Sequence, residues 1–287
     1  MSGSFVSIRP ATPGDAGAIG AVFDAAVRVG WTYLGALAEK PMFGPEEWDR
    51  EVAAHAAPNV LLVATEEDGD VVGFVAAHPA DGELYLLFVH PDAAGRGVGR
   101  RLLEACWRYG ERADGHLILS TEHPAAMRRY ARLGLPLRPC VSAAGIVASA
   151  AMPALDGVED AGEAGIPVAD AIGRAVRGAG HGRDLPVPLA HGARLLVFED
   201  RAFAVARAGE VMLLAARDEA AAARVLWAAL TAGPPGGTVR VDFITAGQDW
   251  AVRACLDAGL ALSPDGPMFA GGRLGPLRPY IPSGAYL

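Results

Sequence analysis

The stretch Glu83–Leu103, ELYLLFVHPDAAGRGVGRRLL, joins an apolar run to a glycine loop that opens directly into an amphipathic segment. Residues 84–89 are rich in side chains that favour a buried strand. Pro91 ends this strand because proline brings no amide donor to a ladder. The loop that follows has glycine at alternate positions, Gly95, Gly97 and Gly99, so its backbone is free to adopt positive φ values.

Helical spacing of apolar residues resumes at Val98. The loop is therefore predicted to lie at a helix N-terminus, where unpaired N–H groups and the helix dipole favour an anion. Three basic side chains, Arg96, Arg100 and Arg101, add positive charge there. Together these features predict a pyrophosphate site, although an ordinary strand-to-helix turn is the alternative for the loop taken alone.

The spacing of the glycines separates the known phosphate-binding loops. A nucleotide-triphosphate P-loop needs Lys followed by Ser or Thr after its last glycine, whereas two arginines follow Gly99. A dinucleotide fingerprint runs G-x-G-x-x-G near the first strand of its unit, whereas this loop runs G-x-G-x-G after roughly eighty residues. The spacing excludes the first class and disfavours the second.

The loop resembles the coenzyme A loop of the GCN5-related N-acetyltransferase (GNAT) family, Arg/Gln-x-x-Gly-x-Gly/Ala. Residues 94–99, AGRGVG, match it at five of six positions, and Ala94 is the departure. A second element, HPAAMRRYARLGL at residues 123–135, follows another strand-like run and resembles the family pattern N-x-x-A-x-x-x-Y-x-x-x-G-F. Here His123 replaces Asn and Leu135 replaces Phe.

The resemblance implies an α/β protein with a mixed sheet, the acyl-CoA N-acyltransferase fold, in the order β, α, ββ, β, α, β, α. It implies acetyl-CoA or another acyl-CoA as co-substrate, without a metal. The residues that it assigns to the co-substrate are Phe88 and Val89 at the splayed strand end, the loop residues Ala94, Gly95, Arg96, Gly97, Val98, Gly99 and Arg100, and His123.

The family chemistry is direct attack of an amine on the thioester. By position, Tyr130 inherits the role of the acid that protonates the departing thiolate. Glu83 is the candidate base at the start of the same strand, and His78 and His90 are further candidates because an imidazole titrates near neutrality. Each of these three also has a purely structural interpretation as a polar strand end.

The second half of the chain repeats the first half in altered form. The run GELYLL at residues 82–87 is echoed by GEVMLL at residues 209–214. Five positions of the second motif recur with a constant shift of 125 residues, at Gln248, Ala251, Cys255, Gly259 and Leu260. The repeat lacks a glycine loop and has cysteine in place of the tyrosine.

These observations predict two tandem GNAT-like lobes. Residues 1–150 form the catalytic, acyl-CoA-binding lobe, and residues 151–287 form a degenerate lobe that is structural or shapes the acceptor site. Coincidental similarity of two α/β halves is the alternative. The proline-rich run of residues 275–287 is predicted to form no regular element and to pack back along the surface.

The composition of the chain limits the kinds of molecule that it is expected to bind. The chain carries 33 acidic against 25 basic residues, a formal charge of −8, which argues against a nucleic-acid surface. No stretch has the length and apolarity of a membrane span, and no signal-peptide pattern precedes the first strand, so a cytoplasmic protein is expected. Three cysteines without metal spacing are predicted to be small core residues.

The acceptor is expected to be a small-molecule or peptide amine, and a homodimer is possible. Four aromatic residues before the glycine loop, Trp31, Tyr33, Phe43 and Trp48, could line its pocket or could belong to the core. Two competing classes stay open. One is an acyl-CoA-binding sensor or pseudoenzyme without transferase activity, and the other is an interaction scaffold that binds no nucleotide.

Overall fold

A computed structural model of the 287-residue chain describes residues 6–29, 44, 48–49, 52, 60–78, 83–110, 114–148 and 153–284. The chain divides into two compact units, Met1–Leu135 and Pro136–Leu287. This division lies before the expected lobe boundary near residue 150, because the strand β6 (Leu137–Ile146) pairs with strands of the second unit.

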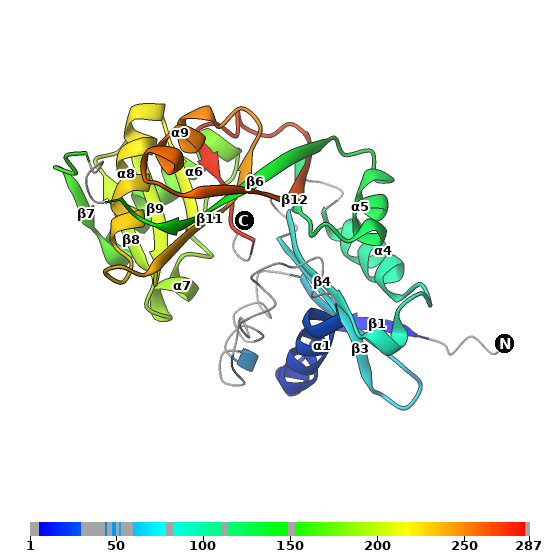
Figure 1. The fold of residues 1–287 in the computed structure, drawn as a ribbon. Helices are drawn as coiled ribbons and strands as arrows, with labels where there is room; N and C mark the ends of the chain where they lie inside the picture. Colours follow the sequence, from blue (N-terminus) through cyan, green and yellow to red (C-terminus); the bar gives the residue numbers. More distant parts are fainter. Residues whose placement is uncertain are drawn as a thin grey trace. The chain divides into compact units, whose positions relative to one another are not determined.

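Among the described residues, the sheet of the first unit has five strands, which pair antiparallel except for the last two. Its order is β1 (Ser7–Pro10), β2 (Val60–Thr65), β3 (Val71–His78), β4 (Glu83–Val89) and β5 (Gly115–Leu119) (Figure 1). β1 to β4 pair antiparallel, whereas β4 and β5 pair parallel. The order of strands and helices along this unit is the one that the sequence predicted.

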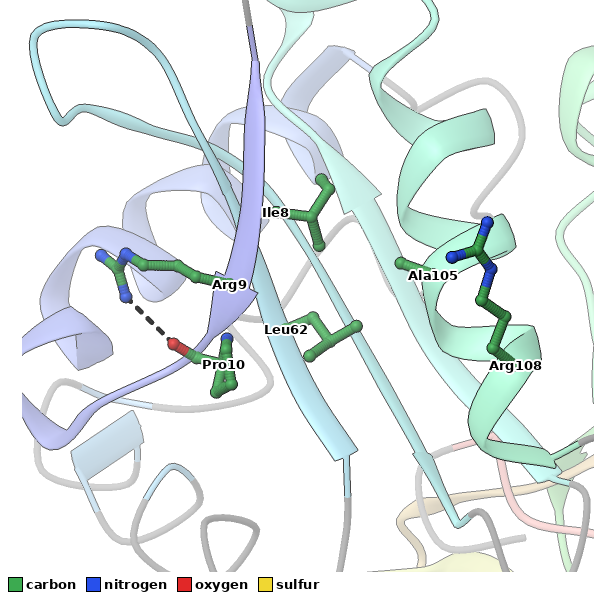
Figure 2. A pocket seen from close by; sticks show the side chains of 6 residues that line it. All are labelled: Ile8, Arg9, Pro10, Leu62, Ala105 and Arg108. Atoms are coloured by element: carbon green, nitrogen blue, oxygen red, sulfur yellow. Dashed lines mark hydrogen bonds between the residues drawn. The ribbon is translucent and has the colours of Figure 1, made fainter.

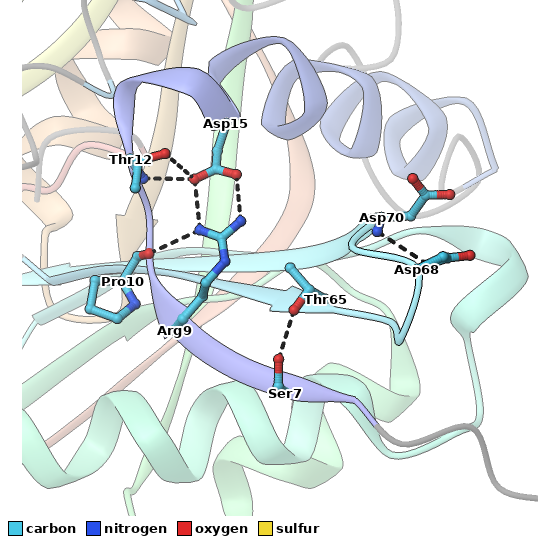
Figure 3. Close-up of polar contacts among 8 residues, drawn as sticks. All are labelled: Ser7, Arg9, Pro10, Thr12, Asp15, Thr65, Asp68 and Asp70. Atoms are coloured by element: carbon cyan, nitrogen blue, oxygen red, sulfur yellow. Dashed lines mark hydrogen bonds and ion pairs between the residues drawn. The ribbon is translucent and has the colours of Figure 1, made fainter.

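Helices cover both faces of this sheet. They are α1 (Ala16–Val29), α4 (Val98–Gly110) and α5 (Pro124–Ala131), with short 3-10 helices at Pro13–Asp15 and Pro91–Ala93. α1 and α4 lie on opposite faces (Figure 3), and neighbouring residues of β3 show why. A Cβ on Gly73 would lie 3.0 Å from the Leu102 side chain of α4, whereas the next residue, Phe74, stacks on Phe88, whose ring meets Phe23 of α1.

The entry into α1 is fixed by a polar cluster at the end of β1 (Figure 3). Arg9 donates two hydrogen bonds to Asp15, at 2.8 and 2.7 Å. Asp15 also accepts from the amide and the hydroxyl of Thr12, forming a capping box at the helix start. The hydrogen bond from Arg9 is the main cause of a lowered Asp15 pKa. The cluster anchors the first turn to the edge of the sheet.

The second unit has a longer sheet, in the order β12, β6, β11, β10, β9, β8 and β7. The strands not yet bounded are β7 (Val158–Asp160), β8 (Arg194–Phe198), β9 (Ala202–Arg207), β10 (Glu210–Ala216), β11 (Thr238–Thr245), β12 (Ala261–Gly272) and β13 (Tyr280–Ile281). β10 and β11 pair parallel, and β13 adds antiparallel to β10.

Both faces of this second sheet are also covered by helices. These are α6 (Ile166–Arg177), α7 (Pro186–Ala190), α8 (Glu219–Thr231) and α9 (Asp249–Asp257), after a 3-10 helix at Gly162–Gly165. Alternate residues of β9 face opposite sides: Ala204 joins the core under α8, whereas Phe203 packs its ring edge-on against His181. The order β8, β9, β10, α8, β11, α9, β12 repeats the order β2, β3, β4, α4, β5, α5, β6.

Two predictions about individual segments have clear outcomes. Cys106, Cys140 and Cys255 are free and buried, as expected of core residues. The prediction for residues 275–287 is wrong in part, because Tyr280 and Ile281 form the buried strand β13. Among the described residues, no helix is long and apolar enough to cross a membrane.

Candidate active site

The glycine loop has the backbone of an anion cradle. Gly95 and Gly97 adopt φ values of 77° and 86°, in the left-handed region that side chains rarely adopt. A Cβ on either residue would meet nothing within 4 Å, so conformation rather than crowding requires glycine there. The amides of Gly95, Gly97, Val98 and Gly99 donate to no other described residue. Four donors therefore gather at the N-terminus of α4.

Arg129 completes this cradle, and the sequence motifs did not predict it. A Cβ on Gly99 would lie 3.1 Å from Nη1 and 3.3 Å from Cζ of Arg129, so the guanidinium covers the first turn of α4. Within the described part of the chain, Arg129 makes no hydrogen bond or ion pair. A cation at the positive end of a helix is unfavourable by itself. An anion between the guanidinium and the loop amides would reverse that repulsion.

The arginines predicted as phosphate ligands are placed differently. Arg96 forms an ion pair of 2.6 Å with Glu66, from the turn between β2 and β3. Arg100 lies 3.8 Å from Glu104, one turn along α4, and both side chains are mostly exposed. Ala94, the departure from the family pattern, is exposed and donates its amide to the carbonyl of Pro91. Arg129 is thus the cation that lies against the loop.

The strands β4 and β5 separate beside the loop. Their parallel pairing covers Glu83 and Leu84 only, although β4 continues to Val89. His90 donates its amide to Val72 of β3 at 2.8 Å. Because successive N–H groups of a strand point to opposite edges, the Val89 amide points toward the edge that β5 has left. Among the described residues, no strand pairs with this edge of β4 beyond Leu84, and the Val89 amide is a donor at its end.

Tyr130 lies on α5 with 4% of its surface exposed. Burial raises the pKa of its phenol to about 12; the charge of Arg129 opposes this shift, and Cys106 adds to it. The hydroxyl is therefore protonated at neutral pH, the state that an acid needs. His123 is the N-cap of the same helix, and its Nδ1 accepts from the Ala125 amide at 3.2 Å. Its Nε2 is then the ring nitrogen that carries the proton.

The predicted bases are only partly described. The backbones of Glu83 and His78 pair with each other across β4 and β3, and their side chains lie outside the described structure. His90 is half-buried, and its Nδ1 accepts from the Asp92 amide at 3.3 Å. His90 thus helps shape the turn that leads into the glycine loop.

Of the four aromatic residues predicted for an acceptor pocket or for the core, only Trp48 is described. Its side chain is 4% exposed and packs against Phe23 and Phe74, with ring centroids 5.3 and 5.8 Å apart, so Trp48 belongs to the core. The half-buried ring of Phe88 contacts Phe23 and Phe74 of the same cluster. Trp31, Tyr33 and Phe43 lie outside the described residues.

A separate hollow lies at the far end of α4. Figure 2 shows its lining, which is Ile8, Arg9, Pro10, Leu62, Ala105 and Arg108. None of these residues belongs to the glycine loop, and Ala105 and Arg108 are about 1.7 and 2.5 helical turns further along α4 than the loop's last glycine. The Arg9 guanidinium is held by Asp15. Across the described residues, no group of three or more His, Cys, Asp or Glu could hold a metal.

Residues 31–135 match a family model described as the acetyltransferase (GNAT) family. The first unit carries a GNAT acetyltransferase domain. The resemblance seen in the two motifs is thereby confirmed, since the matched residues contain the glycine loop and Tyr130. The catalytic and binding roles assigned to individual residues of this GNAT domain stay predictions.

Among curated proteins, the chain is 50% identical over 54 residues to a mycothiol acetyltransferase of Propionibacterium freudenreichii subsp. shermanii. That match covers 17% of this chain and 17% of the relative, so the chain spans only a small part of the relative's length. Two solved structures are similar over nearly the whole chain. A protein of Pyrococcus horikoshii classed as an acetyltransferase has a TM-score of 0.75 at 17% identity, covering 100% of this chain and 97% of its own.

A GCN5-related N-acetyltransferase from Sphaerobacter thermophilus has a TM-score of 0.55 at 15% identity, with 98% of each chain covered. At these identities the likeness concerns the fold. The predicted acyl-CoA N-acyltransferase fold, with its mixed α/β sheet, is confirmed.

Proposed function

We propose that the first unit transfers an acetyl group from acetyl-CoA, or from another acyl-CoA, to a primary amine. The observation that carries this proposal is the set of unpaired amides at the N-terminus of α4, covered by the guanidinium of Arg129. Such a site suits a pyrophosphate. The family match and the acetyltransferase relative support the same class of reaction.

The donor would bind along the free edge of β4 and the loop. The amides of residues 95–99 and Arg129 would hold the pyrophosphate, with Arg96 and Arg100 as exposed charges nearby. The pantetheine arm would add to β4 beside Phe88 and Val89. His123, the N-cap residue of α5, would contact the same arm from the start of that helix.

The reaction is direct aminolysis of the thioester. The amine nitrogen attacks the carbonyl carbon, the Val89 amide stabilises the developing oxyanion, and the C–S bond then breaks. The attacking nitrogen loses a proton to a base, for which Glu83 is the candidate and His78 and His90 are the alternatives. The thiolate receives a proton from Tyr130. The amide product and free coenzyme A leave.

The pKa of Tyr130 sets the order of the last events. Burial raises the pKa of Tyr130 to about 12, above that of an ordinary thiol. A full proton transfer from the phenol to the thiolate is therefore uphill. We infer that Tyr130 first donates a hydrogen bond to the departing sulfur and transfers its proton only as the C–S bond breaks.

The second unit would be a degenerate copy of the first. The repeated order of elements and the recurrence of a glycine with positive φ at Gly134 and Gly259 support this tandem arrangement. Cys255, buried where the first copy has its tyrosine, offers no comparable acid. We assign to this unit a structural role or a role in shaping the acceptor site. The proposed acceptor is a small-molecule or peptide amine. We further propose that the protein is cytoplasmic and forms a homodimer.

Isothermal titration of acetyl-CoA and longer acyl-CoAs into the wild type and Gly97→Glu tests the donor site. A glutamate at Gly97 would be strained at its φ of 86° and would place a negative charge at the cradle. We expect binding to the wild type and none to the variant. At a hundred times its Kd, the ligand should also stabilise the wild type by about 2.7 kcal/mol. Binding by neither protein would refute the proposal and favour an interaction scaffold.

A thiol-release assay with a panel of amines separates an enzyme from a sensor. A transferase releases coenzyme A faster when its acceptor is present, and this release should fall when Tyr130 is replaced by Phe. Acyl-CoA binding without acceptor-dependent release under any condition would instead support a sensor.

A further inference from the structure

The second unit contains the counterpart of the strand edge where the first unit would bind its donor. β10 and β4 have the same length and both begin with glutamate. The parallel pairing of β10 with β11 covers Glu210 and Val211 only, just as β4 leaves β5 after two residues. β10 then continues to Ala216. The separation of β10 from β11 therefore leaves one edge of β10 without β11 as its partner, as the separation of β4 from β5 does in the first unit.

This edge is filled by the chain itself. β13 pairs antiparallel with β10, with Leu214 opposite Ile281 and Ala215 opposite Tyr280. The amide of Ala216 donates to the carbonyl oxygen of Pro279 at 3.2 Å. Ala216 is the last residue of β10, as Val89 is the last residue of β4. The Pro279 carbonyl thus occupies the position that a thioester carbonyl would take in the first unit.

The anion end of this slot is also filled. Only Arg217 and Asp218 join β10 to α8, so no glycine loop precedes the helix. The carboxylate of Asp218 accepts from the Ala221 amide at 2.9 Å, as the N-cap of α8. Arg201 donates to both carboxylate oxygens of Asp218, at 2.9 to 3.1 Å. A protein carboxylate therefore stands where a phosphate would bind, and it already has its cation.

A buried glutamine holds the strand in this slot. Gln248 is 2% exposed and donates to the carbonyl of Leu277 at 2.7 Å. Its side-chain oxygen accepts from the Tyr280 amide at 3.3 Å and from Trp250 Nε1 at 2.7 Å. Gln248 precedes α9 just as His123 precedes α5. A side chain at the start of the equivalent helix therefore contacts the backbone that fills the slot.

We propose that residues 277–283 are a built-in ligand of the second unit, an extended peptide that occupies the counterpart of the acyl-CoA slot. Asp218 takes the place of the pyrophosphate, the backbone of β13 takes the place of the pantetheine, and the Pro279 carbonyl takes the place of the thioester carbonyl. The second unit therefore binds no acyl-CoA, and each chain binds at most one.

Hydrogen–deuterium exchange of the full chain, read by mass spectrometry with and without saturating acetyl-CoA, tests this proposal. We expect slow exchange at residues 214–216 and 277–281, unchanged by acetyl-CoA. Rapid exchange at both segments without ligand, or a change there when acetyl-CoA is added to Gly97→Glu, would overturn the proposal. The exchange in ligand-free protein does not depend on whether the first unit binds a donor, so the two proposals can fail separately.

A matched pair of variants tests the role of Gln248. Gln248→Glu removes the donor to Leu277 but keeps the acceptor, whereas Asp249→Asn changes the exposed neighbour on α9. The substitution leaves the buried Leu277 carbonyl facing a carboxylate oxygen instead of a donor. Exchange at residues 277–281 should therefore rise at least about tenfold in the first variant, with no change in the second. Equal exchange in the two variants would contradict the proposed anchoring.

Arg278→Ala is a milder variant that leaves the core intact. It removes an exposed ion pair of 2.7 Å with Glu219, the residue after the Asp218 cap. Because such pairs contribute little, we expect exchange at residues 277–281 to rise only about twofold to fivefold. Titration of Gly97→Glu then counts the remaining sites. Two acetyl-CoA molecules bound per wild-type chain, with one retained by Gly97→Glu, would show an open second slot and refute the proposal.

Discussion

Arg129 gives the sharpest test of the donor site, because its position is unfavourable without an anion. Its guanidinium lies against the first turn of α4, where a Cβ on Gly99 would come within 3.1 Å of Nη1. Replacing it with Gln removes the charge and keeps much of the side chain. Arg128→Gln, one residue earlier on α5 at an exposed position, is the matched control.

The expected magnitude follows from the hydrogen bonds that the guanidinium would make. A hydrogen bond to a charged partner contributes about 1.5–3 kcal/mol, which corresponds to a loss of roughly 10- to 150-fold in affinity for acetyl-CoA. In the ligand-free protein, the substitution should not be destabilising. Removing a cation from the positive end of a helix should leave the unfolding free energy unchanged or raise it by about 0.3–1 kcal/mol.

Titration calorimetry and thermal unfolding measure both quantities on the same samples. Arg129→Gln should weaken acetyl-CoA binding, lower its salt dependence, and leave or raise the ligand-free melting temperature. Arg128→Gln should change affinity less than about threefold. If Arg129→Gln lowers the ligand-free melting temperature and leaves the affinity intact, the side chain is a structural residue and this reasoning is refuted.

Three further outcomes are expected. Tyr130→Phe should lower acceptor-dependent release of coenzyme A by about 10²- to 10⁴-fold, while the Kd for acetyl-CoA measured by calorimetry changes little. Asp15→Ala should destabilise the first unit by about 1–2 kcal/mol at pH 7 through loss of the cap. Because the folded pKa of Asp15 is lowered, urea titrations should show this difference shrinking as the pH falls below about 4. Burial raises the pKa of Asp242 to about 6, although its ion pair of 2.6 Å with Arg240 opposes this shift. Because ionisation of Asp242 then costs more in the folded than in the unfolded protein, Asp242→Asn should gain stability relative to the wild type as the pH rises from about 4 to about 6. This gain should disappear below about pH 4, and a gain that is independent of pH would contradict the assignment.

Local sequence predicted the elements around the glycine loop. The apolar run before Pro91 and the helical spacing after Gly97 act over a few residues, so their outcome depends little on the rest of the chain. The positive φ values at Gly95 and Gly97 likewise follow from the residue type. The GNAT resemblance rests on these local features, and the family match confirms it.

Long-range pairing was beyond the reach of sequence patterns. The proline-rich run after Gly275 has no strand pattern, yet Tyr280 and Ile281 become a strand because the separation of β10 from β11 leaves an edge for them. Likewise, residues 137–146 follow the motifs of the first unit but pair with β11 and β12 of the second. In both cases the strand's partner lies far away along the chain, so a local sequence pattern does not reveal the pairing.

The sequence by itself determined the order of strands and helices along the first unit, the glycine loop and the class of ligand that the loop suits, because backbone conformation and helix ends are local properties. Only the tertiary structure decided which cation faces the loop and what fills the second slot. The packing of α5 brings the Arg129 guanidinium against Gly99. The turn between β2 and β3 brings Glu66 to Arg96, with which it forms an ion pair. Such contacts depend on geometry between elements, which no spacing within one element encodes.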